Sequence, residues 1–107
     1  MTDLRQARKA LVAQVLEGDG MASHIHRRAA FDNAGLFRPT SALIEKVAHH
    51  ADTVIDEDVL AVRASDLSED QIFELVVCAA IGQAARQCDA ALAALDLAAP
   101  DAASGKG

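Results

Sequence analysis

Residues 67–95 read LSEDQIFELVVCAAIGQAARQCDAALAAL, and this stretch decides the fold. Its length corresponds to about eight turns of α-helix. Ser68 and Gln71 have the spacing of a capping box, in which each side chain accepts a hydrogen bond from the other residue's backbone N–H. Leu67 and Ile72 flank this pair at the spacing of a hydrophobic staple. The stretch therefore predicts a long helix with a well-defined start.

The first half of this helix is apolar nearly all round. Within residues 72–82 only Glu74 and Gly82 are not apolar. A helix of this kind is normally buried inside a fold or inside an oligomer. We therefore expect it to be the central element of the domain.

A polar patch interrupts one apolar stripe of the predicted helix. The patch consists of Gln83, Arg86 and Gln87, and it follows the stripe that contains Ile72 and Leu75. Buried polar groups need hydrogen-bond partners, so we expect the patch either to face a pocket or to pair with a carboxylate across an interface. The opposite side of the helix is also apolar and contains Val77, Ile81, Cys88, Leu92 and Leu95.

Composition favours a single all-α domain. The chain has 107 residues, and 51% of them are hydrophobic, which is too many for a disordered chain. Much of that share is alanine, the best helix former, while aromatic residues make up only 3%. Small side chains bury little area each, so we expect part of the apolar surface to be buried between subunits.

Charge and hydropathy exclude two classes of partner. The formal net charge is −6, which does not suit a nucleic acid or an anionic membrane surface. No apolar run approaches the roughly 20 residues that span a bilayer. The N-terminal sequence MTDLRQARKALV lacks the order of regions found in a secretory signal. We therefore expect a cytoplasmic protein.

Four shorter helices are expected before the long one. Gly18 and Gly20 end the first helix, since glycine readily adopts the left-handed conformation found at helix ends. Ser23 caps the second helix, and Thr40 or Ser41 caps the third. The expected helices span residues 3–17, 24–32, 40–52 and 56–64.

The C-terminal residues differ in composition from the rest. Residues 98–107 read AAPDAASGKG, which is typical of a flexible tail. We therefore expect one domain over residues 1–97. Its N-terminal helices occupy residues 1–38, and its core unit occupies residues 41–97.

A resemblance to a known family extends over residues 41–95, about half of the chain. Residues 42–54 read ALIEKVAHHADTV, and residues 54–95 read VIDEDVLAVRASDLSEDQIFELVVCAAIGQAARQCDAALAAL. This order of a helix, a short helix with an acidic start, a capped turn and a long apolar helix resembles the carboxymuconolactone decarboxylase and alkylhydroperoxidase AhpD-like superfamily. The resemblance implies an AhpD-like helical domain.

The peroxidase motif of that superfamily is mostly replaced. Members with peroxidase activity carry a glutamate, then eleven residues, then C-x-x-C and a histidine four positions further on. With the glutamate placed on Glu74, Arg86 and Asp89 stand at the cysteine positions and Ala93 at the histidine position. Dithiol peroxidase chemistry needs an attacking thiolate, a nearby resolving thiol and a base. The resemblance therefore implies a member with a degenerate redox site.

Two enzymatic alternatives stay open. A decarboxylase- or isomerase-like enzyme needs no cysteine pair, and Arg86 would hold a carboxylate while Glu74 or His50 serves as the acid or base. A residual thiol peroxidase would use Cys88. This residue lies ten positions after Cys78, about 15 Å along a helix, so we expect two free, buried thiols instead of a disulfide. The candidate catalytic residues are thus Glu74, Arg86, His50 and Cys88.

The histidines do not predict a metal site. His24 and His26 project about 200° apart on a helix, so they cannot share an ion. His49 and His50 are neighbours, and we expect His50 to be partly buried beside Leu43. No metal and no cofactor is expected.

These observations predict an AhpD-like all-α domain that forms a homo-oligomer through the helix of residues 68–97. Its expected role is that of a small-molecule-binding or accessory protein without dithiol peroxidase activity. The expected ligand-binding residues are Gln83, Arg86 and Gln87.

Overall fold

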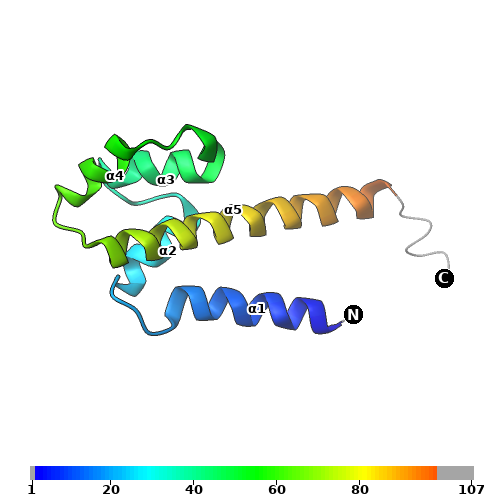
Figure 1. Cartoon of the computed structure of the whole chain (residues 1–107). Helices are drawn as coiled ribbons and strands as arrows, with labels where there is room; N and C mark the ends of the chain where they lie inside the picture. The colour runs from blue at the N-terminus through cyan, green and yellow to red at the C-terminus, as the bar shows by residue number, and fades with distance from the viewer. Residues whose placement is uncertain (1, 99–107) are drawn as a thin grey trace, which may run out of the picture.

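The computed structural model describes residues 2–98, which form five α-helices and one 3-10 turn (Figure 1). The elements are α1 (Thr2–Glu17), α2 (His24–Asp32), α3 (Thr40–His49), η1 (Ala51–Thr53), α4 (Asp56–Arg63) and α5 (Glu69–Ala98). The predicted all-α class is thus confirmed. Of the predicted tail, only Ala98 lies within the described residues, where it ends α5.

The start of α5 is the one that the sequence predicts. Ser68 Oγ accepts a hydrogen bond from Gln71 N at 3.1 Å, and Gln71 Oε1 accepts one from Ser68 N at 2.9 Å. Leu67 packs against the cluster of buried side chains that contains Ile72. The capping box and the hydrophobic contact together fix the point at which α5 begins.

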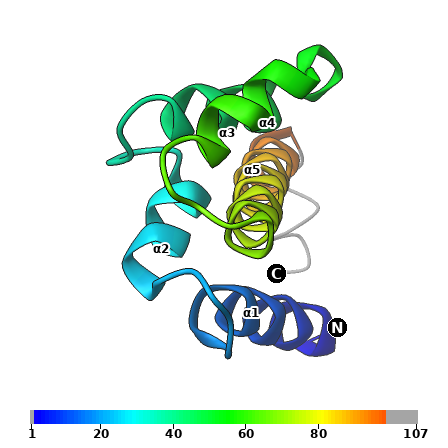
Figure 2. The ribbon, with the colours of Figure 1, turned by 60° about the vertical axis from the view of Figure 1, so that its left-hand side comes forward.

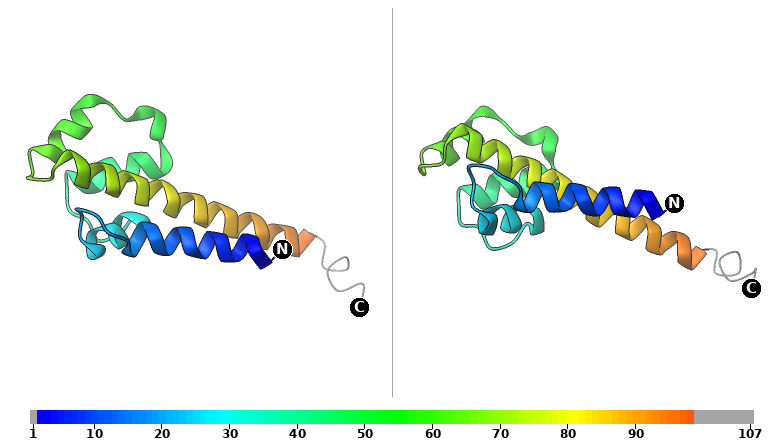
Figure 3. Two further views of the ribbon diagram at one scale, coloured as in Figure 1. Left: turned by 60° about the horizontal axis from the view of Figure 1, so that its bottom comes forward. Right: turned by 90° about the horizontal axis from the view of Figure 1, so that it is seen from below.

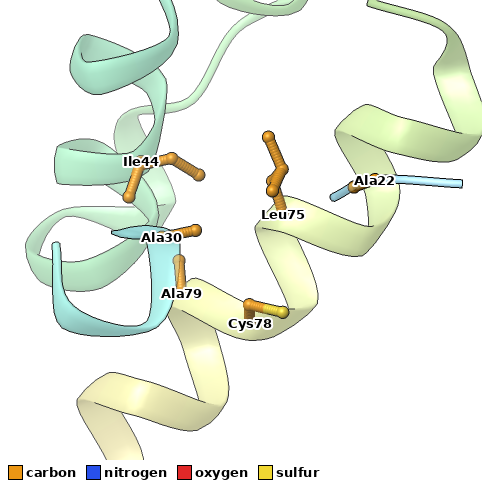
Figure 4. Close-up of a cluster of buried hydrophobic side chains, with 6 residues drawn as sticks. All are labelled: Ala22, Ala30, Ile44, Leu75, Cys78 and Ala79. Carbon is orange, nitrogen blue, oxygen red and sulfur yellow. The ribbon is translucent and has the colours of Figure 1, made fainter. Parts of the chain in front are cut away.

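The other helices surround α5 on three sides. Figure 2 looks nearly along α5 and shows α3 and α4 above it, α2 to its left and α1 below it. α1 runs antiparallel to α5, as the two views of Figure 3 show. The main core (Figure 4) is formed by Ala22, Ala30, Ile44, Leu75, Cys78 and Ala79. A smaller core joins α3, α4 and α5 through Leu43, Val62 and Ile72.

A glycine permits the close approach of α2 to α5. A Cβ atom at Gly82 would overlap the carbonyl oxygen of Phe31 and would lie 2.7 Å from its carbonyl carbon. Any side chain at this position would therefore push the end of α2 away from α5.

The start and end of α3 differ from the prediction. The cap predicted at Thr40 or Ser41 is wrong, because α3 begins at Thr40 and Pro39 precedes it without a side-chain cap. The carbonyl of Pro39 instead accepts hydrogen bonds from the backbone of the first turn. The helix ends at His49 because His50 leaves helical geometry, with φ −145° and ψ 54°.

The first two helices have the predicted ranges, to within one residue. Ser23 caps α2 as predicted, since its side chain accepts a hydrogen bond from His26 N at 3.1 Å. The reason predicted for the end of α1 is wrong. Among residues 2–98 the one glycine with a left-handed backbone is Gly35, with φ 93°, and neither Gly18 nor Gly20 adopts that conformation.

Candidate functional site

Glu74 of α5 holds the loop between α1 and α2. Its Oε2 accepts a hydrogen bond from Met21 N and its Oε1 accepts one from Ala22 N, both at 2.8 Å. A Cβ atom at Gly20 would lie 2.7 Å from Glu74 Oε1, so a side chain at this position would displace the carboxylate from the loop. Burial raises the pKa of Glu74, whereas the two hydrogen bonds and the charge of Arg27 lower it. The lowering effects together are larger, so the pKa of Glu74 lies below its ordinary value.

Arg27 of α2 is a buried charged residue, only 4% exposed. Its Nε donates to Ala22 O at 3.1 Å, and its Nη1 donates to Gly18 O at 2.6 Å and more weakly to Val15 O at 3.4 Å. The last carbonyls of a helix have no partner within the helix itself. Arg27 therefore stabilises the end of α1 by binding its free carbonyl groups, whereas the sequence predicted that Gly18 and Gly20 would end this helix.

A groove of about 230 Å³ lies between α1 and α5 beside these two charged residues. The residues that line it are Gln14, Val15, Asp19, Arg27, Phe73, Glu74, Val77 and Cys78. The walls from Val15, Phe73 and Val77 are apolar, while Glu74 and Arg27 make the groove polar at one place. The groove is therefore amphipathic.

Cys78 forms part of the groove but is chemically protected. The residue is 1% exposed, and its Sγ lies 3.6 Å from Val15 O, to which it donates a weak hydrogen bond. Burial raises the pKa of the Cys78 thiol, and this effect exceeds the lowering by the charge of Arg27 and the small further raising by the charge of Glu74. The thiol is therefore protonated at neutral pH and is a poor nucleophile.

The predicted polar patch connects α5 to the end of α2. Arg86 Nη1 donates to Phe31 O at 2.6 Å, and Arg86 Nη2 donates to Gln83 Oε1 at 3.0 Å. Arg86 thus pairs with a backbone carbonyl, whereas the sequence led us to expect a carboxylate or a pocket. Gln87 is exposed. None of these three residues lines the α1–α5 groove.

The other candidate residues lie apart from one another. Arg86 and Glu74 are twelve positions apart on α5, about 18 Å along its axis, and they hold different segments. His50 is exposed beyond the end of α3, so the expectation that it is partly buried is wrong. Its carbonyl accepts hydrogen bonds from the backbone and hydroxyl of Thr53.

The two cysteines have different environments. Both are free, as predicted, but only Cys78 is buried, and the expectation of a buried Cys88 is wrong. Asp89, which lies next to Cys88, forms an ion pair with Arg8 of α1 at 2.7 Å. That position therefore joins two helices in this chain.

Some other kinds of site are not seen within residues 2–98. In this part of the chain, no group of three or more His, Cys, Asp or Glu side chains is arranged to hold a metal ion. None of its helices has both the length and the hydropathy needed to cross a membrane.

A second hollow, of about 490 Å³, lies beside the loop from α2 to α3, where Asn33 donates to Glu45 Oε1 at 2.7 Å. It contains none of the predicted site residues.

Sequence reasoning missed Arg27, which proves to be the buried charge of the site. Its one local signal is its spacing on α2. Arg27 precedes Ala30 and Phe31 by three and four positions, so it belongs to the face that α2 turns toward the core. An arginine on a core-facing stripe needs partners, but the sequence does not reveal that backbone carbonyls supply them.

Fold and site together define a small all-helical protein whose long C-terminal helix forms one wall of an amphipathic groove. Comparison with family models, with curated proteins and with solved structures finds no match. The AhpD-like resemblance therefore rests on the sequence pattern.

Proposed function

We propose that the chain is a small-molecule-binding or accessory protein of the AhpD-like kind, which works in the cytoplasm as a homo-oligomer and lacks dithiol peroxidase activity. The groove between α1 and α5 supports the binding role. Glu74, the one residue that matches the family's peroxidase motif, lines this groove. The remaining motif positions at Arg86 and Asp89 serve contacts between helices.

The groove favours a small, mostly apolar ligand with a carbonyl oxygen. Its volume of about 230 Å³ is below the range of roughly 300–1,000 Å³ that is common for ligand pockets. Arg27 Nη2 makes no hydrogen bond to any described residue, so it is available to a ligand acceptor. Because the carboxylate of Glu74 lines the same groove and would repel an anion, a neutral carbonyl group suits this place better than an anion does.

Nuclear magnetic resonance titration tests the binding role. The probes are small lactones and ketones, with matched hydrocarbons that lack the carbonyl group. We expect at least one carbonyl probe to shift the amide resonances of Val15, Ala22 and Val77, and the matched hydrocarbon to bind more weakly. Gln14→Trp, at an exposed position that lines the groove, should abolish these shifts.

Gln6→Trp is the matched control for this experiment. Gln6 is exposed on the same helix but does not line the groove, so this variant should bind as the wild type does. The binding role is refuted if no probe shifts the groove resonances. Equal binding by the Gln14→Trp variant would place the ligand elsewhere.

Peroxide turnover with a dithiol reductant is expected to stay at the uncatalysed rate. Cys78 is buried with a raised pKa, and Cys88 lies about 15 Å farther along α5, so no second thiol is positioned to resolve an oxidised cysteine. Peroxide consumption should be the same for the wild type, for Cys88→Ser and for buffer. Turnover that Cys88→Ser abolishes would establish the thiol peroxidase instead.

A further inference from the structure

One face of α5 carries an apolar stripe that the described helices leave half-buried at its start and exposed from Ala84 onward. The stripe consists of Val77, Ile81, Ala84, Cys88, Ala91 and Leu95. Figure 2 shows the other helices above, to the left of and below α5, with no described helix to its right. Phe73, at the start of this face, is 68% exposed, and Leu95, at its end, is 64% exposed. This face is therefore open to a partner from outside the described fold.

The spacing of the stripe is that of a coiled-coil seam. Successive members are separated by four, three, four, three and four residues, which is the alternation of a heptad repeat. From Val77 to Leu95 the stripe is about 27 Å long. Ala84, Cys88 and Ala91 are small, so a second helix can approach closely along the middle of the stripe.

The distribution of charge favours an uncharged apolar partner surface. The charged residues in the second half of α5 are Arg86, Asp89 and Asp96, which lie about 100° to 180° around the helix axis from Leu95. Asp89 is already paired with Arg8. A strongly charged partner would find no opposite charge on the stripe, whereas a second copy of the chain offers the same apolar surface at the same spacing.

We propose that two copies of the chain pair through this stripe, with their α5 helices antiparallel. The inference rests on the homo-oligomer of the proposed function and specifies its interface. In the antiparallel register, Val77 packs against Leu95 of the second copy, and Ile81 packs against Ala91 of the second copy. Ala84 packs against Cys88 of the second copy, and the two-fold axis passes near Arg86.

This register distributes side-chain volume evenly. A large residue, Ile81, faces a small one, Ala91, and the order is reversed across the two-fold axis. A parallel pair would instead place Ile81 opposite Ile81 and Ala91 opposite Ala91. It would alternate wide and narrow layers, which close packing disfavours. Antiparallel helices also oppose their dipoles.

The face of α5 alone is too small for a stable dimer interface, so α1 must contribute to the buried area as well. A single helix face of this length and about 10 Å width has a projected area of roughly 300 Å². A standard interface buries about 800 Å² per partner. Leu11 of α1 is 50% exposed and lies one turn before Gln14 and Val15, which line the groove beside Phe73 and Val77. The flank of α1 therefore extends the same surface beside the groove.

Sedimentation of charge variants tests the interface. At micromolar concentration the wild type should sediment at twice the 11.2 kDa mass of one chain. Ala84→Glu places a carboxylate in the centre of the stripe and should raise the dissociation constant by roughly a hundredfold or more. Ala90→Glu makes the same change at an exposed position on another face of α5 and should leave the dimer intact. Circular dichroism should show equal helix content in both variants.

Oxidative cross-linking tests the orientation. Ala84→Cys, with Cys88 retained, should form an intermolecular disulfide on mild oxidation, because positions 84 and 88 face each other in the antiparallel register. The wild type should not, since its two Cys88 residues are offset by about 6 Å along the axis in addition to the separation of the helices. Rapid cross-linking of the wild type would overturn the antiparallel arrangement.

The outcomes separate this inference from the proposed function. A wild-type protein that sediments as a monomer overturns both the homo-oligomer and its interface. An oligomer that Ala84→Glu leaves intact, or that is larger than a dimer, overturns the proposed interface alone.

Discussion

At the scale of single residues, a buried arginine and a half-buried glutamate replace ordinary capping at the junction of α1 and α2. Arg27 binds the carbonyls at the end of α1, and Glu74 binds the N–H groups of the following loop. The charge of Arg27 also lowers the pKa of Glu74, so the two groups attract one another.

Glu74→Gln should lower the free energy of unfolding by about 1–2 kcal/mol at neutral pH, because the amide N–H₂ cannot accept a hydrogen bond from the loop. The pKa of Glu74 is lower in the folded protein than its ordinary value of 4.5, so the ionised group stabilises the fold above that pH. This contribution is lost as the pH falls through the folded-state pKa. The difference between variant and wild type should therefore shrink in acid, as urea denaturation at several pH values can measure.

Glu69→Gln is the matched control for this prediction. Glu69 pairs only with Arg63 at the surface, and such exposed pairs contribute little. Its replacement should change the free energy of unfolding by less than about 1 kcal/mol at any pH. Equal urea midpoints for the Glu74→Gln variant and the wild type at neutral pH would contradict the role given to Glu74.

At the scale of helices, the contact between α2 and α5 depends on one carbonyl group. Phe31 O accepts a hydrogen bond from Arg86 Nη1, and the same peptide group lies against Gly82. The missing side chain of Gly82 therefore sets the separation of the two helices, and Arg86 sets the point at which they meet.

Gly82→Ala should destabilise the protein although alanine is the better helix former. Helix propensity alone would stabilise by about 1 kcal/mol. The overlap with the backbone of Phe31 cannot be relieved by a side-chain rotation, and overpacking of this kind costs about 1–3 kcal/mol or more. We therefore expect a lower melting temperature in calorimetry. Ala90→Gly calibrates the propensity term at an exposed position, and stabilisation by Gly82→Ala would refute the close approach.

At the scale of the whole molecule, local signals predicted the helices, while the contacts between them were not predictable. The Ser68–Gln71 box and the Ser23 cap depend on residues three positions apart, so the sequence displays them. The partners that Arg86 and Glu74 bind on other elements are backbone groups, 55 residues away for Arg86 and 53 and 52 residues away for Glu74. Backbone groups occur at every position, so no pattern of side chains indicates which of them will be chosen.

The same reason explains the errors on exposure. Cys88 and His50 lie on apolar stripes of their helices in the sequence, but burial depends on whether another element covers the stripe. The other helices cover α5 on three sides only (Figure 2), and Cys88 is exposed. His50 falls just beyond the last turn of α3, where the stripe has ended.

The clamp that Glu74 applies to the α1–α2 loop also constrains the order of events during synthesis. Glu74 follows Met21 by 53 residues, and Cys78 follows Val15 by 63. α1 is therefore translated well before the residues of α5 on which it docks. Until α5 is made, α1 has no surface on α5 to bind, so its docking waits for residues more than 50 positions later in the sequence.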